Sequence, residues 1–392
     1  MSISLRYGDV VTVSINHRLN IIGYFDLSDF GDEYINSGNA GGDDIIAALQ
    51  WIQENVEKFG GEFPRNYSDV LTLKGIGEYT AALLQSPGAG GSYAKGYSMS
   101  GVLDVEKPVE EESGKALAES IMAELCIRSV KELEEVPYQS LADAYIKVRP
   151  AFAGENRYVG DLPFRNEFYA GDPLLYGFRK ETAHIPMLVG SVFGEMASFV
   201  PGNADKKKMP EEAEIRGVEE VLGAEAAALL IPLFKQAYPE RHISDLTRMD
   251  YIFRNGIHKY IRMRSGLNQC TYSYMFNHDM PIEGGSTPWH CADISYVFHN
   301  TEFVPSAQEE CAEKLEKLIF DTVMAFAHSG NPNHNGLPEW PASTPEKEQT
   351  MVFDVKPELR CNYDHELMPL YKKYMQPVFE KNRAKITEKA QH

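Results

Sequence analysis

The feature that most constrains the fold is a β-branched stretch followed, after a glycine-rich loop, by an amphipathic helix. Residues 9–16 (DVVTVSIN) are bounded by polar turn formers, which predicts a buried strand. After the loop at 37–42, apolar side chains recur at steps of four and three and form one helical face: Ile45, Leu49, Ile52, Val56 and Phe59. Gly60-Gly61 then predicts the end of the helix. A strand followed by a long amphipathic helix is the unit of a parallel sheet, so the sequence predicts an α/β fold.

Further elements fit the same sheet. Residues 186–190 and 272–276 are predicted as strands, each ending where loop residues begin. A helix is predicted from 308 to 328, ended by Gly330-Asn-Pro. Its apolar side carries Cys311, Leu315, Leu318, Ile319, Thr322 and Phe326. The middle, about 105 to 265, has mostly helical patterns with acidic faces, and no repeat or low-complexity linker divides the chain, so we expect a single domain over 1–392.

Composition and charge limit the classes of function. With 392 residues, 43% hydrophobic and 24% charged, the chain has a globular composition that can bury a sizeable core. The 38 basic and 57 acidic residues give a net charge of −19, which makes nucleic acid an unfavourable partner. The longest apolar run, 226–234, falls far short of the roughly 20 residues that span a bilayer. The first residues lack a signal-peptide pattern, so a cytoplasmic protein without membrane contact is expected.

The cysteines and histidines give no sign of a metal or redox centre. The five cysteines are widely spaced, with no CxxC pair, which predicts reduced thiols: Cys126, Cys270, Cys291, Cys311 and Cys361. His328 and His334 have no metal-ligand spacing and are expected on loop surfaces. The sequence therefore predicts neither a metal nor a cofactor.

Four groups of residues, in chain order, together resemble one known family. The first comprises NHRLN at 16–20, GYFD at 23–26, SGNAG at 37–41, ALQWI at 48–52 and FGG at 59–61; the others are PMLVGSVFGE at 186–195, WHCADISYVF at 289–298, and GNPN at 330–333 with Trp340-Pro341. They resemble the type-B carboxylesterases, which have the α/β-hydrolase fold and include cholinesterase-like and non-catalytic adhesion relatives. The resemblance covers residues 5–61 and 84 to about 385.

The resemblance implies two catalytic residues and one loss. Glu195 matches the family's catalytic acid and His290 its catalytic histidine. The family's nucleophile is the serine of a GxSxG turn between a strand and a helix, and no GxSxG occurs in this sequence. When Gly75 is aligned with the first glycine of that turn, Gly77 stands at the serine position.

The resemblance also implies that the chain is truncated. The family's glycine-rich oxyanion loop precedes the strand matched by residues 9–16, and this sequence begins almost at that strand. Loss of an oxyanion donor costs roughly 3 to 4 kcal/mol of transition-state stabilisation. The family's first three strands are missing as well, and because its third strand lies between the fourth and the fifth, this predicts a gap in the sheet centre with unpaired strand edges.

Residues 62–83 resemble another kind of protein. LKGIGEYTA at 73–81, preceded by Phe63-Pro64, looks like the helix-hairpin-helix of adenine DNA glycosylases, whose hairpin points backbone N–H groups at a phosphate. The alternative is a tight turn, allowed by Gly75 and Gly77, between a strand and the helix from Glu78. The segment 62–82 has a net charge of −1, so at best weak, salt-sensitive binding of nucleic acid is expected.

The sequence thus predicts a carboxylesterase-family protein that would act on a small carboxylic ester and is impaired or inactive because the nucleophile and oxyanion loop are absent. One alternative is a non-enzymatic ligand- or partner-binding protein of the same fold, and another is a weak nucleic-acid-binding module through Gly75-Ile76-Gly77. A chimera without a selected function, the oligomeric state and the surviving activity are left open. Cys291 is expected as a buried thiol pointing away from the neighbouring imidazole, and Ser100 as a structural residue.

Overall fold

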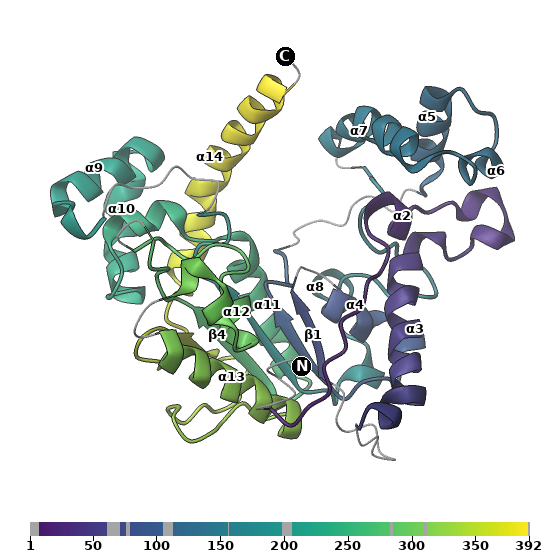
Figure 1. Ribbon diagram of the computed structural model, residues 1–392. Coiled ribbons are helices and arrows are strands. Elements are labelled where there is room, and N and C mark those ends of the chain that lie inside the picture. The colour runs from purple at the N-terminus through teal and green to yellow at the C-terminus, as the bar shows by residue number, and fades with distance from the viewer. Residues whose placement is uncertain are drawn as a thin grey trace.

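A six-stranded sheet forms the centre of the molecule (Figure 1). The computed structural model describes residues 8–60, 71–75, 79–104, 113–155, 157–197, 206–282, 285–308 and 312–390. The strands lie in chain order: β1 (Leu71–Gly75), β2 (Lys95–Met99), β3 (Met187–Val192), β4 (Thr271–Phe276), β5 (Gln349–Phe353) and β6 (Glu358–Cys361). The first five are parallel to their neighbours and β6 is antiparallel to β5, so the carboxyl ends of β1 to β5 share one edge.

Both faces of the sheet are buried, as a parallel sheet requires. On β3, Leu188 points to one face while Met187 and Val189 point to the other, and each is at most 1% exposed. The Leu188 face packs on α12 (Ile294–Val297) and α13 (Ala312–Ser329). The opposite face packs on three other helices: α3 (Ala40–Asn55), α4 (Tyr79–Gln85) and α11 (Ile252–Ser265).

Two further helical groups extend this core. The first continues the second face through Met275 and Val352, and comprises α9 (Glu211–Leu222), α10 (Ala224–Ala237) and α14 (Leu367–Ala390). The second has its own apolar cluster and comprises α2 (Asn20–Tyr24), α5 (Lys115–Leu125), α6 (Val130–Leu133) and α7 (Tyr138–Gly154). Figure 1 shows α5, α6 and α7 at the upper right, beyond α2, while α9 and α10 lie at the upper left beside α14. The short helix α8 (Pro173–Tyr176) lies against α11.

Two predicted strands and two predicted helices are confirmed. Residues 186–190 and 272–276 fall in β3 and β4, which are paired neighbours. The helix predicted from 308 is α13, which ends at Ser329 before Gly330 at a φ of 75°. The helix predicted to Phe59 is α3 followed by a 3-10 turn, and Gly60 ends it at a φ of 82°. The fold class is α/β, as expected.

The strand predicted at residues 9–16 is wrong. These residues have no regular secondary structure, and Val13 and Ile15 are 40% and 38% exposed. A preference of β-branched residues for strands is realised only on a paired, half-buried surface, and no described strand pairs with this segment. The expected gap in the sheet is wrong as well, because each strand from β1 to β6 is hydrogen-bonded to the next.

The segment 62–83 forms a strand and a helix where it is described. Residues 71–75 are strand β1, which pairs with β2, and α4 begins at Tyr79. This order agrees with the predicted alternative of a turn between a strand and a helix, and a helix-hairpin-helix is not shown. Residues 62–70 and 76–78, which include Gly77, lie outside the described residues. None of the helices within the described ranges has the length and apolar character that a membrane crossing needs.

Candidate active site

Glu195 lies in the turn after β3 and is fully buried. Its Oε1 accepts hydrogen bonds from Ser100 Oγ at 2.5 Å and from the Val192 backbone N–H at 2.9 Å. Ser100 follows β2 directly, and its own N–H donates to the Gly190 carbonyl of β3 at 2.7 Å. Groups at the ends of two neighbouring strands therefore hold Oε1 of this carboxylate, and Oε2 makes none of these bonds. The contact with Glu195 gives Ser100 the structural role expected of it.

His290 takes up the second oxygen of Glu195. Its Nδ1 lies 2.5 Å from Oε2, and its backbone N–H donates to the Glu195 carbonyl at 3.0 Å. The ring stacks on Phe253 of α11, with centroids 5.9 Å apart. The side chain is 30% exposed while the carboxylate is wholly buried, so the imidazole alone meets solvent. A carboxylate bound to Nδ1 fixes the tautomer and leaves Nε2 to exchange protons, which is the arrangement of a hydrolase acid and base.

Cys291 also contacts His290, contrary to the prediction that its thiol is buried and points away. The backbone of Cys291 has a φ of 72°, in the left-handed region. The thiol is half-buried and forms no disulfide. Its hydrogen bond with the imidazole, and then the bond to Glu195, raise the pKa of His290 to about 10. An imidazole with that pKa is protonated at neutral pH and becomes a free base only in alkaline solution.

Two more buried carboxyl groups surround the pair. Asp250 accepts bonds from three backbone N–H groups at the start of α11, and Asp293 accepts one from the Tyr274 hydroxyl at 3.0 Å. Burial, followed by the nearby charge of Glu195, raises the pKa of each to about 7. Sequence reasoning missed both residues as members of the site. The position of Asp250 just before a helix, and of Asp293 within the matched stretch 289–298, were the available signals.

The end of β1 lies next to this cluster in the sheet. Gly75 is paired in register with Met99, and Ser100, which binds Glu195, comes directly after Met99. The turn that follows β1 therefore begins at the edge that carries Glu195. Gly77, at the position matched to the family's serine, belongs to residues that the structure does not describe.

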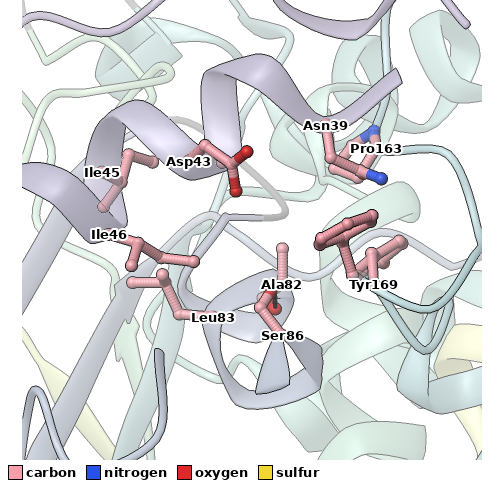
Figure 2. Close-up of a pocket in the computed structure, with 11 residues that line it drawn as sticks. Asn39, Asp43, Ile45, Ile46, Ala82, Leu83, Ser86, Pro163 and Tyr169 are labelled. Atoms are coloured by element: carbon pink, nitrogen blue, oxygen red, sulfur yellow. Dashed lines mark hydrogen bonds between the residues drawn. The ribbon is translucent and has the colours of Figure 1, made fainter. Parts of the chain in front are cut away.

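A small hollow lies elsewhere, between α3 and α4. Figure 2 shows side chains of α3, among them Asp43 and Ile46, facing Ala82 and Leu83 of α4, with Tyr169 at one end. Burial raises the pKa of Asp43. The lining includes neither Glu195 nor His290, so this hollow is separate from the acid–base pair.

Among the described residues, Cys126, Cys270 and Cys361 form no disulfide, and Cys311 lies outside the described residues. His334 lies outside regular secondary structure and bonds to the Thr322 hydroxyl. The prediction that His328 lies on a loop is wrong, because it lies in the last turn of α13, where it bonds to the Gly8 carbonyl.

A mostly parallel sheet covered on both faces, with an acid after one strand bound to a histidine on a later loop, is the architecture of the α/β-hydrolases. Comparison with known proteins identifies the group more closely. Residues 2–369 match the model of the carboxylesterase family, and the chain belongs to that family.

The relatives agree with this assignment. The solved structure of an esterase from anaerobic Clostridium hathewayi, described as able to hydrolyse aliphatic aromatic polyesters, superimposes with a TM-score of 0.88 at 38% identity, covering 94% of this chain and 74% of that one. The medium-chain fatty acyl-CoA hydrolase precursor of Anas platyrhynchos is 28% identical over 86% of this chain, which spans 62% of that relative's length. The para-nitrobenzyl esterase of Bacillus subtilis is 27% identical over 88% of this chain and 70% of its own.

Proposed function

We propose that this chain is an esterase-fold protein that retains the acid and base of ester hydrolysis but hydrolyses carboxylic esters poorly, because it lacks the serine nucleophile. The observation that carries the proposal is the bond from His290 Nδ1 to the buried Glu195 Oε2, in a sequence without a GxSxG turn. Glu195 and His290 are thus proposed as the acid and base of the site.

The reaction mechanism of the carboxylesterase family shows which catalytic step the missing serine removes. In that route a serine attacks the ester carbonyl, the histidine takes the serine proton and later gives it to the leaving alcohol, and the carboxylate orients the imidazole. With glycine at position 77 there is no hydroxyl from which His290 could take a proton. The base could then act only on water, and a pKa of about 10 keeps the imidazole protonated at neutral pH. Slow, alkaline-dependent turnover without an acyl-enzyme is the expected behaviour.

The substrate class follows from the family and stays within this proposal. Relatives are named for para-nitrobenzyl esters, acyl-CoA thioesters and polyesters, which share an acyl carbon open to attack. A small carboxylic ester is therefore the expected ligand. Nucleic acid is not favoured, because the net charge of −19 opposes phosphate binding.

The test is hydrolysis of p-nitrophenyl butyrate by the full chain and four variants: His290→Ala, Gly77→Ser, their double variant, and Cys291→Ala. We expect slow turnover without a burst in the original chain, and a gain of at least about tenfold in Gly77→Ser that disappears in the double variant. Burst kinetics in the original chain would overturn the proposal. Loss of such a burst in Cys291→Ala would identify the thiol as the nucleophile, since Cys291 already contacts the base.

A further inference from the structure

A second polar cluster lies further along α11, outside the acid–base pair. His258 from α11 meets Asp364 and His365 from the turn between β6 and α14, and one ligand atom of each lies within 4.8 Å of the others. The two imidazole rings are 4.4 Å apart between centroids. Glu348, just before β5, reaches the same point. Three segments far apart in the sequence therefore bring two imidazoles and two carboxylates together.

The separations between these atoms fit one small ion. His258 Nε2 lies 3.1 Å from Asp364 Oδ1 and 3.9 Å from Glu348 Oε2, and His365 Nε2 lies 3.0 Å from the same Glu348 oxygen. A tetrahedral zinc ion with ordinary bond lengths holds its ligand atoms about 3.3 Å apart. The observed distances are both shorter and longer than that value, so small side-chain movements would bring the four ligand atoms to the separations that zinc requires.

Arg254 prepares the two carboxylates as ligands. Its Nη1 donates to Glu348 Oε1 at 2.7 Å, so the Glu348 oxygen that faces His365 is the opposite one, Oε2. With Asp364 the guanidinium pairs twice: Nε donates to Oδ2 at 2.7 Å, and Nη2 donates to Oδ1, the oxygen that also faces His258, at 2.9 Å. Ser273 and Thr350 also donate to Glu348 Oε1. Such outer hydrogen bonds orient the ligands of a metal ion.

The charges and the donor types point to the kind of ion. The carboxylates of Glu348 and Asp364 are buried, and each pairs with Arg254 on one side and with an imidazole on the other. Two imidazole nitrogens with carboxylate oxygens suit zinc and neighbouring transition metals, whereas magnesium and calcium prefer oxygen ligands alone. His365 has a side chain 37% exposed and gives the ion a path from solvent.

We propose that His258, Asp364 and His365, with Glu348 as the fourth ligand, bind one zinc ion that ties α11 to the start of α14. A closed set of four protein ligands defines a structural rather than a catalytic site. The site is independent of the esterase proposal, since none of its ligands belongs to the Glu195–His290 pair.

The experiment is calorimetric titration of Zn²⁺ into the full chain after chelation and desalting, with Co²⁺ absorption as a geometry readout. The variants are His258→Gln and His365→Gln, and the matched control is His184→Gln, an exposed histidine elsewhere on the surface. We expect one equivalent to bind, tetrahedral Co²⁺ bands, a higher Tm with zinc, and affinity at least about tenfold weaker in both ligand variants but not in the control.

Two results would overturn the proposal. One is that the original chain binds Zn²⁺ no more tightly than His365→Gln does. The other is that His184→Gln loses as much Zn²⁺ affinity as the ligand variants do. Because His365 is partly exposed, its variant is expected to fold even where His258→Gln does not. Neither result involves ester turnover, so failure here is distinguishable from failure of the esterase proposal.

Discussion

The part of the sheet around β3 to β5 and the segment before α2 differ in how their residues are held. On the first side, Glu195, Arg254 and Asp364 are at most 1% exposed, and each makes several hydrogen bonds to separate segments. On the other, residues 9–18 have no regular structure and Val13 is 40% exposed. Glu195 and His290 are therefore held by buried contacts between separate segments, whereas residues 9–18 have no regular structure.

The largest expected effect comes from the buried arginine. Arg254→Met leaves the carboxylates of Glu348 and Asp364 without their cation, which should lower the free energy of unfolding by about 3 to 5 kcal/mol. Urea denaturation measures this loss in the free energy of unfolding. The matched change on the other side is Arg18→Met, where a half-exposed pair with Asp44 should cost at most about 1 kcal/mol. If the two variants lost equal free energy of unfolding, the buried region around β3 to β5 and the segment before α2 would not differ in how firmly their residues are held.

Asp293→Asn should make stability less sensitive to pH. Burial and the charge of Glu195 raise the folded-state pKa of Asp293 to about 7. Because that value exceeds the unfolded one, near 3.9, the contribution of the protonated carboxyl is present in acid and lost as pH rises to about 7. The variant should gain about 2 to 4 kcal/mol over the original chain between pH 4 and pH 8. Urea unfolding at each pH gives the free energy of unfolding of both proteins. If the two curves of this free energy against pH ran parallel, the raised pKa of Asp293 would not be a cause of the pH dependence.

Ser100→Ala tests how firmly the acid is held. It removes a donor to the buried Glu195 Oε1 and leaves the Val192 N–H as the partner of that oxygen. A hydrogen bond to a charged group contributes about 1.5 to 3 kcal/mol, and a loss of that size should appear on denaturation. Ser120→Ala on α5, whose hydroxyl bonds only its own helix carbonyl, is the control and should change stability little. A loss no larger than the control's would mean that Ser100 does not hold Glu195.

Cys291→Ala should lower the pKa of His290. The hydrogen bond with Cys291 is the largest cause of the rise to about 10, so its removal should shift the ring titration by at least about one unit, worth about 1.4 kcal/mol. The raised pKa stabilises the fold fully below the unfolded value, near 6.5, and that contribution is lost as pH rises to about 10. NMR titration of the His290 ring checks this, with Cys361→Ala as control. An unchanged His290 pKa in the first variant would refute the role of the thiol.

The smallest effect is expected in the exposed segment. Val13→Ala with Ile15→Ala should change the free energy of unfolding by no more than about 0.5 kcal/mol, because both side chains are more than a third exposed. Leu188→Ala in β3, buried to 1% exposure, should cost about 2 to 5 kcal/mol. A large effect in the first variant would mean that the segment packs as a strand in solution.

Elements with a strong local period could be predicted from the sequence. The apolar spacing of α3 and α13 and the short apolar runs of β3 and β4 are properties of neighbouring residues, and the glycines that end the helices act within one turn. Glu195 and His290 were recognised by the same means, since each lies in a short stretch with a family pattern. The structure brings the two together, and their catalytic role stays a prediction.

The segment at 9–16 shows where local pattern ends. Its composition predicts a strand, yet pairing depends on a neighbour that the described chain does not provide. Cys291 shows the same limit at one residue, because neither its left-handed φ nor its contact with His290 can be read from the local sequence pattern.

The sequence by itself determined the α/β class, the family, and the absence of a GxSxG motif, because each depends on residue identity and short-range spacing. Only the tertiary structure decided which strands pair, how the ring of His290 is charged, and that His258 meets Asp364 and His365. Those properties arise from contacts between distant segments, such as His258 and Asp364, which are 106 residues apart, and from burial that places charges in a medium of low dielectric.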